Sequence, residues 1–224
     1  MQGPFWLGDD PEGPFPPPHL ALKSPNGLLA AGGDLTPQRL LSAYRQGIFP
    51  WYSEGEPILW WSPNPRAVLF PDELHISRSL KKRIRRHPYE VTLNRNFSAV
   101  VEGCAAPRGN PEQAGTWITA EMKRGYIDLH RLGHAHSVEC WSGSTLVGGL
   151  YGVSVAGLFW AESMFSRAND ASKIALVSLL TGSMVGKIQL MDIQMLSPHL
   201  KRLGAREIPR ADYLRYLQPP PATG

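Results

Sequence analysis

The chain has 224 residues, 42% of them hydrophobic and 19% charged, with a formal net charge of +4. This composition is typical of a globular protein with one large domain, or one domain and a smaller appendage. No apolar run approaches the roughly 18 residues that span a bilayer, and no secretory signal is visible. The two cysteines lie outside any C-x-x-C spacing, which indicates neither a disulfide framework nor a zinc site. We therefore expect a cytoplasmic protein without a membrane partner.

The first 65 residues predict a small domain. Residues 1–26 are rich in proline and glycine, which favours an extended arm. Thr36 and Pro37 are typical of a helix start, so residues 38–46 are expected to be helical up to Gly47. A short aromatic strand over residues 58–63 completes this domain, and residues 66–224 form a second one.

A basic helix opens the second domain. Ser77 is its predicted N-cap, and Ile76, Leu80 and Ile84 recur at a spacing that lets them face a core. The remaining surface can be a solvated face or can contact the phosphates of a nucleic acid. It carries five positive side chains: Lys81, Lys82, Arg83, Arg85 and Arg86.

The rest of the domain mixes helices and strands. A strand over residues 89–93 precedes helices over 97–104 and 119–132. Strands follow over 136–141, 145–153 and 158–166, joined by tight turns that contain glycine. A helix over 171–185 leads to a strand over 188–194, and short helices are expected over 198–203 and 210–217. An antiparallel meander, a helix and a returning strand predict an α+β fold.

Polar side chains interrupt two of these apolar strands. Alternation places Glu162 on one strand face with Met164, and it places Asp192 and Gln194 together on a face of the later strand. A buried carboxylate must find hydrogen-bond donors. A carboxylate and an amide side by side can also accept from and donate to a reacting amine or ester. The alternative is that Asp192 and Gln194 are satisfied polar groups at a strand end.

Other chemistries have little support. His134, His136 and Glu139 lie close together, but no recognised metal-ligand spacing accompanies them. The sequence has no phosphate-binding glycine loop and no G-x-S-x-G elbow, which disfavours nucleotide cofactors and a serine nucleophile. We expect neither a metal nor a cofactor.

Four tryptophans lie beside proline or glycine in irregular segments. Such side chains can stack on nucleic-acid bases, although each alone is more often part of a core. They are Trp51, Trp60, Trp61 and Trp117.

Ten short segments, in order over roughly residues 23–217, carry a family resemblance. They are Pro25-Asn-Gly-Leu-Leu-Ala30, Gly32-Gly-Asp-Leu35, Gly47-Ile-Phe-Pro-Trp51, Ile58-Leu-Trp-Trp-Ser-Pro63, Leu74-His-Ile-Ser-Arg-Ser79, Gly115-Thr-Trp-Ile-Thr119, Leu132-Gly-His-Ala-His-Ser137, Leu146-Val-Gly-Gly-Leu-Tyr-Gly152, Glu162-Ser-Met-Phe-Ser-Arg167 and Ala171-Ser-Lys173. Together they resemble the leucyl/phenylalanyl-tRNA–protein transferases, bacterial enzymes of the N-end rule. The N-terminal arm and residues 107–114 lie outside the resemblance, and Ala161 stands where the family pattern has glycine.

The resemblance implies a fold and an activity. The fold is a GNAT-like N-acyltransferase domain preceded by a small N-terminal domain. The activity is transfer of Leu, Phe or, less readily, Met from aminoacyl-tRNA to the α-amine of proteins that begin with Arg or Lys, which marks them for degradation. We expect a monomer.

The resemblance also implies roles for individual residues. Trp51 and Trp117 would hold the 3′-terminal adenosine of the donor, and Glu162 would anchor polar atoms of the aminoacyl-adenosine. Asp192 and Gln194 would carry the chemistry, with Asp192 polarising Gln194 and the Gln194 carbonyl oxygen orienting the amine. The basic helix would contact tRNA phosphates. The side-chain pocket of the donor would be lined by Leu150, Phe159, Leu176, Leu179 and Met191.

Two rival functions use the same features. An acetyltransferase using acetyl-CoA would need a pyrophosphate-binding loop of the form R/Q-x-x-G-x-G/A, which the sequence does not show. A nonenzymatic RNA-binding module would need only the basic helix and the tryptophans. In that case Glu162, Asp192 and Gln194 would have no function.

Overall fold

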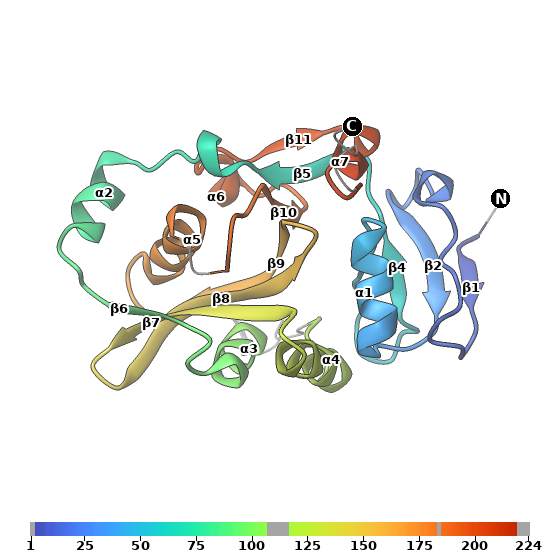
Figure 1. Cartoon of the computed structure of the whole chain (residues 1–224), viewed down its shortest axis with the longest axis horizontal. Coiled ribbons are helices and arrows are strands. Elements are labelled where there is room, and N and C mark those ends of the chain that lie inside the picture. Colours follow the sequence, from blue (N-terminus) through green and yellow to red (C-terminus); the bar gives the residue numbers. More distant parts are fainter. Residues whose placement is uncertain (1–2, 107–116, 183–184, 219–224) are drawn as a thin grey trace, which may run out of the picture.

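Two sheets of different size organise the chain in the computed structural model, which describes residues 3–106, 117–182 and 185–218 (Figure 1). The smaller sheet has the order β1-β2-β4-β3 and the larger has the order β11-β5-β10-β9-β8-β7-β6. The strands are β1 (Phe5–Leu7), β2 (Leu28–Gly32), β3 (Phe49–Pro50), β4 (Leu59–Trp61), β5 (Arg66–Leu69), β6 (Glu90–Leu93), β7 (Ala135–Ser142), β8 (Thr145–Val155), β9 (Leu158–Ser166), β10 (Leu190–Gln194) and β11 (Arg206–Ile208).

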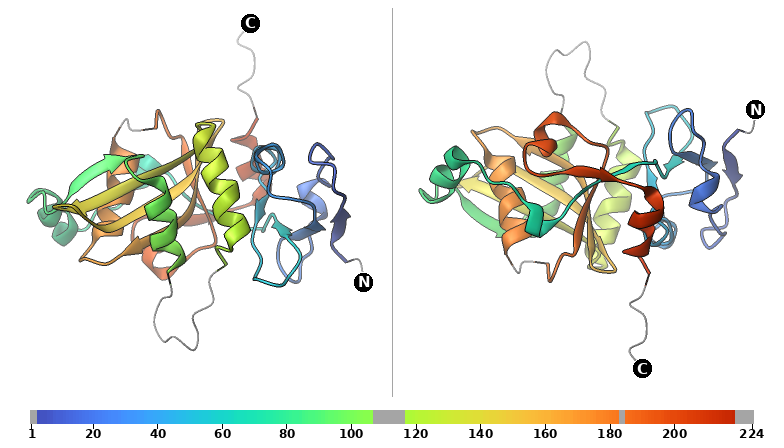
Figure 2. Two further views of the ribbon diagram at one scale, coloured as in Figure 1. Left: turned by 90° about the horizontal axis from the view of Figure 1, so that it is seen from below. Right: turned by 90° about the horizontal axis from the view of Figure 1, so that it is seen from above.

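Helices cover both faces of the larger sheet. The helices are α1 (Pro37–Arg45), α2 (Arg78–Ile84), α3 (Phe97–Ala105), α4 (Ala120–Arg131), α5 (Ala171–Thr181), α6 (Pro198–Lys201) and α7 (Arg210–Arg215). Figure 2 shows α3 and α4 side by side on one face, and α5 lies on the opposite face. α1 stands between the two sheets and packs against α4. The predicted α+β class is confirmed.

Local signals fix several element ends as predicted. The Thr36 hydroxyl accepts the Arg39 N–H at the start of α1, and the Ser77 hydroxyl accepts the Leu80 N–H at the start of α2. The β8–β9 turn has positive φ at both Ala156 and Gly157, as a two-residue hairpin requires. The prediction that the helix after β9 reaches residue 185 is wrong. α5 ends at Thr181, because Gly182 takes an extended conformation.

The N-terminal segment is packed rather than free, which corrects the extended-arm prediction. β1 pairs in parallel with β2, and the buried ring of Phe15 meets Trp60 edge-on at 4.8 Å. The guanidinium of Arg39, which is buried, donates to the carbonyl oxygens of Gly8, Asp10 and Gly13. One side chain of α1 therefore replaces the hydrogen bonds that this irregular backbone lacks.

The larger sheet contains two strands that the sequence reading missed. β5 pairs antiparallel with both β10 and β11, and β10 runs parallel to β9 after the crossover through α5. β5 therefore lies beside the strand that carries Asp192. A division into domains at residue 65 stays a prediction, and β5 begins at the next residue.

Candidate functional site

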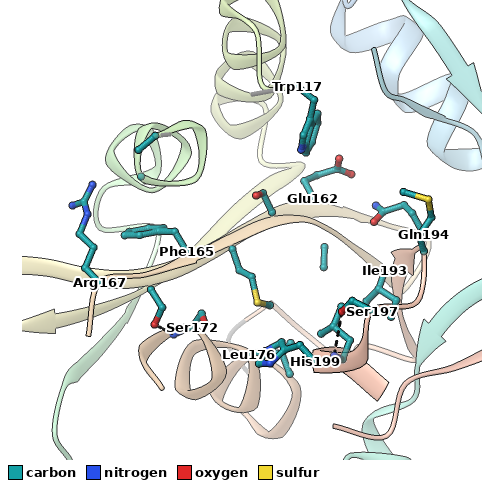
Figure 3. Close-up of a pocket in the computed structure, with 18 residues that line it drawn as sticks. Trp117, Glu162, Phe165, Arg167, Ser172, Leu176, Ile193, Gln194, Ser197 and His199 are labelled. Carbon is teal, nitrogen blue, oxygen red and sulfur yellow. Dashed lines mark hydrogen bonds between the residues drawn. The ribbon is translucent and has the colours of Figure 1, made fainter. Parts of the chain in front are cut away.

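A cleft of about 800 Å³ opens along β9, between Trp117 on one side and α5 and α6 on the other. Figure 3 shows Trp117 and Glu162 opposite Leu176 and His199, with Arg167 and Gln194 toward the two ends. A smaller hollow of about 210 Å³ shares part of its wall with the cleft, including Glu162 and Gln194.

Glu162 is the buried carboxylate of this wall. Its side chain is 9% exposed, and it accepts the Tyr44 hydroxyl at 2.8 Å and the Tyr126 hydroxyl at 2.7 Å. The two phenol oxygens are 3.0 Å apart. Burial raises the pKa of Glu162 to about 7, and the hydrogen bonds from Tyr126 and Tyr44 limit the rise. Glu162 therefore meets the cleft as a carboxylate held by two phenols from α1 and α4.

A β-bulge at Glu162 changes the strand faces. Tyr151 pairs with Ser163 and Gly152 pairs with Ala161, so Glu162 is the extra residue on β9. Beyond the bulge, Phe165 packs into the core that contains Trp160, while Met164 packs toward α5. The prediction that Met164 shares the face of Glu162 is therefore wrong.

Asp192 lies behind the cleft rather than in its wall. Its carboxylate is fully buried and accepts Arg66 Nε at 2.9 and 3.0 Å and Arg66 Nη2 at 2.7 Å. It also accepts the Tyr213 hydroxyl and the Gln194 backbone N–H. Burial alone would lower the pKa of Arg66, but the charge of Asp192 outweighs it and raises that pKa. Four donor groups thus surround Asp192.

Gln194 turns away from Asp192. The β5–β10 register shifts between these two residues, and Gln194 has φ +57. The prediction that their side chains share one strand face is wrong, because this irregularity interrupts the alternation. In the amide orientation that satisfies its donors, the Gln194 side-chain nitrogen donates to the carbonyl oxygens of Ile193 and Ala161. The Gln194 side chain lines the cleft.

The two predicted tryptophans meet in the smaller hollow. Trp51 follows β3, is 38% exposed and lies against Trp61, with ring centroids 5.8 Å apart. Trp117 lines both the hollow and the cleft. The structure therefore brings Trp51, Trp117, Glu162 and Gln194 to one cavity, and Trp60 lies in the core.

The five predicted pocket residues share one apolar cluster beneath the cleft. Leu176 lines the cleft itself, on α5. The other four are buried behind it: Leu150, Phe159, Leu179 and Met191. Of these five residues, only Leu176 forms part of the cleft surface, and the other four pack behind it.

The basic helix is a separate surface. α2 lies at the end of the molecule far from the smaller sheet (Figure 1). Arg83 Nε lies 3.1 Å from Asp170 Oδ2, beside the start of α5. Four of the predicted basic residues are exposed: Lys81 and Lys82 on α2, and Arg85 and Arg86 directly after it.

The groups that suggested a metal site have protein partners. His136 Nδ1 lies 3.0 Å from Asn94 Nδ2, and Glu139 accepts the hydroxyls of Thr92 and Ser137. Across the described ranges, no group of three metal-ligating side chains occurs, and no helix there is long and apolar enough to cross a membrane. Burial raises the pKa of Cys140 to about 12, so its thiol is a poor nucleophile.

Sequence reasoning missed four partners of the carboxylates. Tyr44 and Tyr126 sit on amphipathic helices, where a tyrosine at a core position predicts only a buried ring with a partner for its hydroxyl. Arg66 at the start of a short strand is the clearer signal, because a buried arginine needs a carboxylate. Tyr213 gives no comparable signal.

Comparisons with known proteins cover nearly the whole chain. A family profile described as leucyl/phenylalanyl-tRNA protein transferase matches residues 68–218, and a profile for the N-terminal domain of that family matches residues 33–64.

Curated relatives carry the same description. The leucyl/phenylalanyl-tRNA–protein transferase of Stutzerimonas stutzeri is 56% identical over 95% of this chain and 92% of its own length. Those of Pseudomonas aeruginosa and Klebsiella pneumoniae are each 57% identical over 91% of this chain, and over 89% and 85% of their own lengths. A GCN5-related N-acetyltransferase from Kribbella flavida matches in structure with a TM-score of 0.36 and 9% identity, over 73% of this chain and 58% of that chain.

Proposed function

This chain belongs to the leucyl/phenylalanyl-tRNA–protein transferase family, and we propose that it moves leucine or phenylalanine from aminoacyl-tRNA to a protein amine. Methionine is a poorer donor amino acid. The acceptor is the N-terminal α-amine of a protein that begins with Arg or Lys, and the product is a signal for degradation. The observation that carries the proposal is the convergence of two tryptophans, a carboxylate and a glutamine on one cavity.

The donor end of tRNA occupies the hollow between the tryptophans. Base–aromatic stacking stabilises a bound nucleotide by about 1–3 kcal/mol per base. Trp51 and Trp117 provide such rings at the wall of the hollow, and Glu162 lines both the hollow and the cleft. Its carboxylate, held by two phenols, accepts from hydroxyl or amine groups of the aminoacyl-adenosine.

The side chain of the donor amino acid enters the cleft toward α5. Leu176 and the apolar residues behind it offer no hydrogen bond to a tyrosine hydroxyl, which selects Phe over Tyr. Leu, Phe and Met are unbranched at Cβ. A wall close to that carbon accordingly excludes Ile and Val.

The reaction needs positioning more than a strong base. An aminoacyl ester is already activated, and an α-amine with a pKa of about 8 is readily deprotonated. The amine nitrogen attacks the ester carbonyl carbon, a C–N bond forms and the C–O bond to the ribose breaks. The amine gives up one proton and the ribose oxygen gains one. The Gln194 side-chain oxygen accepts from the amine and orients it.

The basic surface of α2 binds the tRNA backbone. Its exposed lysines and arginines match the charge of phosphates, and such contacts do not read sequence. The large separation between α2 and the smaller sheet suits a long ligand that contacts both ends of the molecule.

Radiolabelled Leu-tRNA tests the function directly. We expect label to enter a peptide that begins with Arg and not one that begins with Ala. Transfer of acetyl from acetyl-CoA instead would support the acetyltransferase, and tRNA binding without any transfer would support the RNA-binding module.

A further inference from the structure

Arg66 is held rigidly between aromatic rings. Its guanidinium carbon lies 4.6 Å from the ring centre of Phe49 and 4.8 Å from that of Tyr213. A planar guanidinium suits this position because it stacks on rings while its edge donates to a carboxylate. Phe49 itself lines the smaller hollow. The rings therefore fix the orientation of the group that binds Asp192.

Three separate elements deliver the donors that surround Asp192. Arg66 comes from β5, Tyr213 comes from α7, and the backbone N–H of Gln194 lies two residues further along the chain. Arg66 uses both Nε and Nη2, and Tyr213 donates to Oδ2. Oδ1 accepts Arg66 Nε at 2.9 Å and also the backbone N–H of Gln194 at 2.9 Å. The orientation of the carboxylate thus sets the position of one particular backbone amide.

That amide belongs to a residue in an unusual conformation. Gln194 has φ +57, in the left-handed region that residues other than glycine rarely adopt. The hydrogen bond to Asp192 holds this conformation, which aims the Gln194 side chain at the cleft. Asp192 does not line the cleft, whereas Gln194 lines both the cleft and the hollow. Asp192 therefore acts on the cleft through Gln194.

We propose that Arg66 and Tyr213 are positioning residues that, through Asp192, hold Gln194 in the conformation needed for aminoacyl transfer. The inference rests on the proposed function and deepens it. Arg66 and Tyr213 touch no part of the cleft, so their removal affects the reaction step and leaves donor binding unchanged.

The sharpest variant is Tyr213→Phe, because it removes one hydroxyl and keeps the ring that stacks on Arg66. The matched control is Tyr216→Phe, directly after α7, where the tyrosine is 38% exposed and its ring meets Phe70 edge-on. With Leu-tRNA and a peptide that begins with Arg, we expect Tyr213→Phe to lower kcat about tenfold. KM for Leu-tRNA should stay within twofold, and the control should match the wild type.

Arg66→Lys keeps the positive charge but loses the bidentate hydrogen bonding to the Asp192 carboxylate. We therefore expect kcat to fall further, by about 100-fold. A measurement without turnover accompanies the kinetics: in protein labelled with ¹⁵N-glutamine, the backbone amide signal of Gln194 should shift in Tyr213→Phe and not in Tyr216→Phe. This comparison decides whether Gln194 moves even if Arg66→Lys fails to fold.

The outcomes separate the two proposals. Absence of transfer by the wild type would refute the proposed function. Transfer by the wild type together with an unchanged kcat and Gln194 signal in Tyr213→Phe would overturn the positioning role. A loss of Leu-tRNA binding equal to the loss of kcat/KM would also overturn it.

Discussion

The Oδ1 atom of Asp192 accepts the backbone N–H of Gln194 at 2.9 Å, so the Asp192 side chain contacts the main chain of Gln194. The hypothesis that Asp192 polarises the Gln194 amide group therefore needs revision. This contact fixes the backbone position of Gln194.

Replacing either residue should separate chemistry from binding. We expect Asp192→Ala and Gln194→Ala each to lower kcat at least 100-fold while Kd for Leu-tRNA in filter binding changes less than threefold. Gln189→Ala, an exposed glutamine just before β10, is the control. Loss of Leu-tRNA binding in both variants would show that the two residues maintain the donor site instead.

The raised pKa of Glu162 predicts how stability depends on pH. The folded protein holds this proton up to about pH 7, whereas the unfolded chain releases it near pH 4.3. The folded state therefore binds more protons between these values, and the free energy of unfolding falls as pH rises through the window. Two to three pH units correspond to about 3 kcal/mol.

Glu162→Gln should remove this contribution. In urea unfolding, the free energy of unfolding of the wild type is expected to fall by about 3 kcal/mol more between pH 4.5 and pH 8 than that of the variant. Equal pH dependence in the two proteins would show that the pKa of Glu162 is not raised in the folded protein.

Trp117 offers a test of the adenosine site. Trp117→Ala should raise Kd for Leu-tRNA about tenfold or more, because a stacking ring contributes about 1–3 kcal/mol. Trp117→Phe should retain part of the affinity. Trp6→Ala provides a control, since that side chain is 74% exposed on β1 and outside the cleft. Weakening by the control alone would place the adenosine elsewhere.

The role of the α2 surface can be tested through the salt dependence of tRNA binding. Changing Lys82, Arg85 and Arg86 together to Ala should weaken tRNA binding and reduce the slope of log K against log salt by about 0.7–0.9 per lost phosphate contact. These three leave the Arg83–Asp170 ion pair intact. A control that removes Lys23, Arg131 and Lys187, which are exposed on other segments, should keep the slope. An unchanged slope in the α2 variant would exclude it from the tRNA interface.

Gly152 tests the bulge that places Glu162. A Cβ at Gly152 would lie 2.0 Å from the Trp160 carbonyl oxygen and 2.5 Å from the Phe159 ring. Since a backbone oxygen cannot move away without breaking the β8–β9 pairing, Gly152→Ala should destabilise the protein by about 3 kcal/mol or more. Gly8→Ala, with nothing within 4 Å of its Cβ, should leave the melting temperature unchanged. Near-neutral stability of Gly152→Ala would argue against the bulged register.

Local sequence signals predicted the elements whose ends are set by their own residues. The β8–β9 hairpin and α1 are examples, since a turn glycine lies within the hairpin and the N-cap Thr36 directly precedes the helix. β5 escaped prediction because it has only four residues, and its pairing with β10 depends on residues more than 120 positions away.

The sequence predicted which polar residues to consider for the candidate site, but it did not predict how they are arranged. Glu162, Asp192 and Gln194 stood out because they are polar residues on apolar strands. Their arrangement depends on two strand irregularities, at Glu162 and between Asp192 and Gln194, which shift alternation by one residue. The donors to the carboxylates come from α1, α4, β5 and α7, and sequence spacing carries no information on contacts between such distant segments.

The place of β5 between β10 and β11 has a consequence for biosynthesis. Arg66 leaves the ribosome 126 residues before Asp192, and during that interval neither long edge of β5 has its partner. An unpaired apolar strand invites pairing with other chains, and a charged residue on it opposes such pairing. Before Asp192 has been synthesised, the positive charge of Arg66 thus opposes pairing of the nascent strand with other chains. Arg66 binds Asp192 only after that later part of the chain has been made.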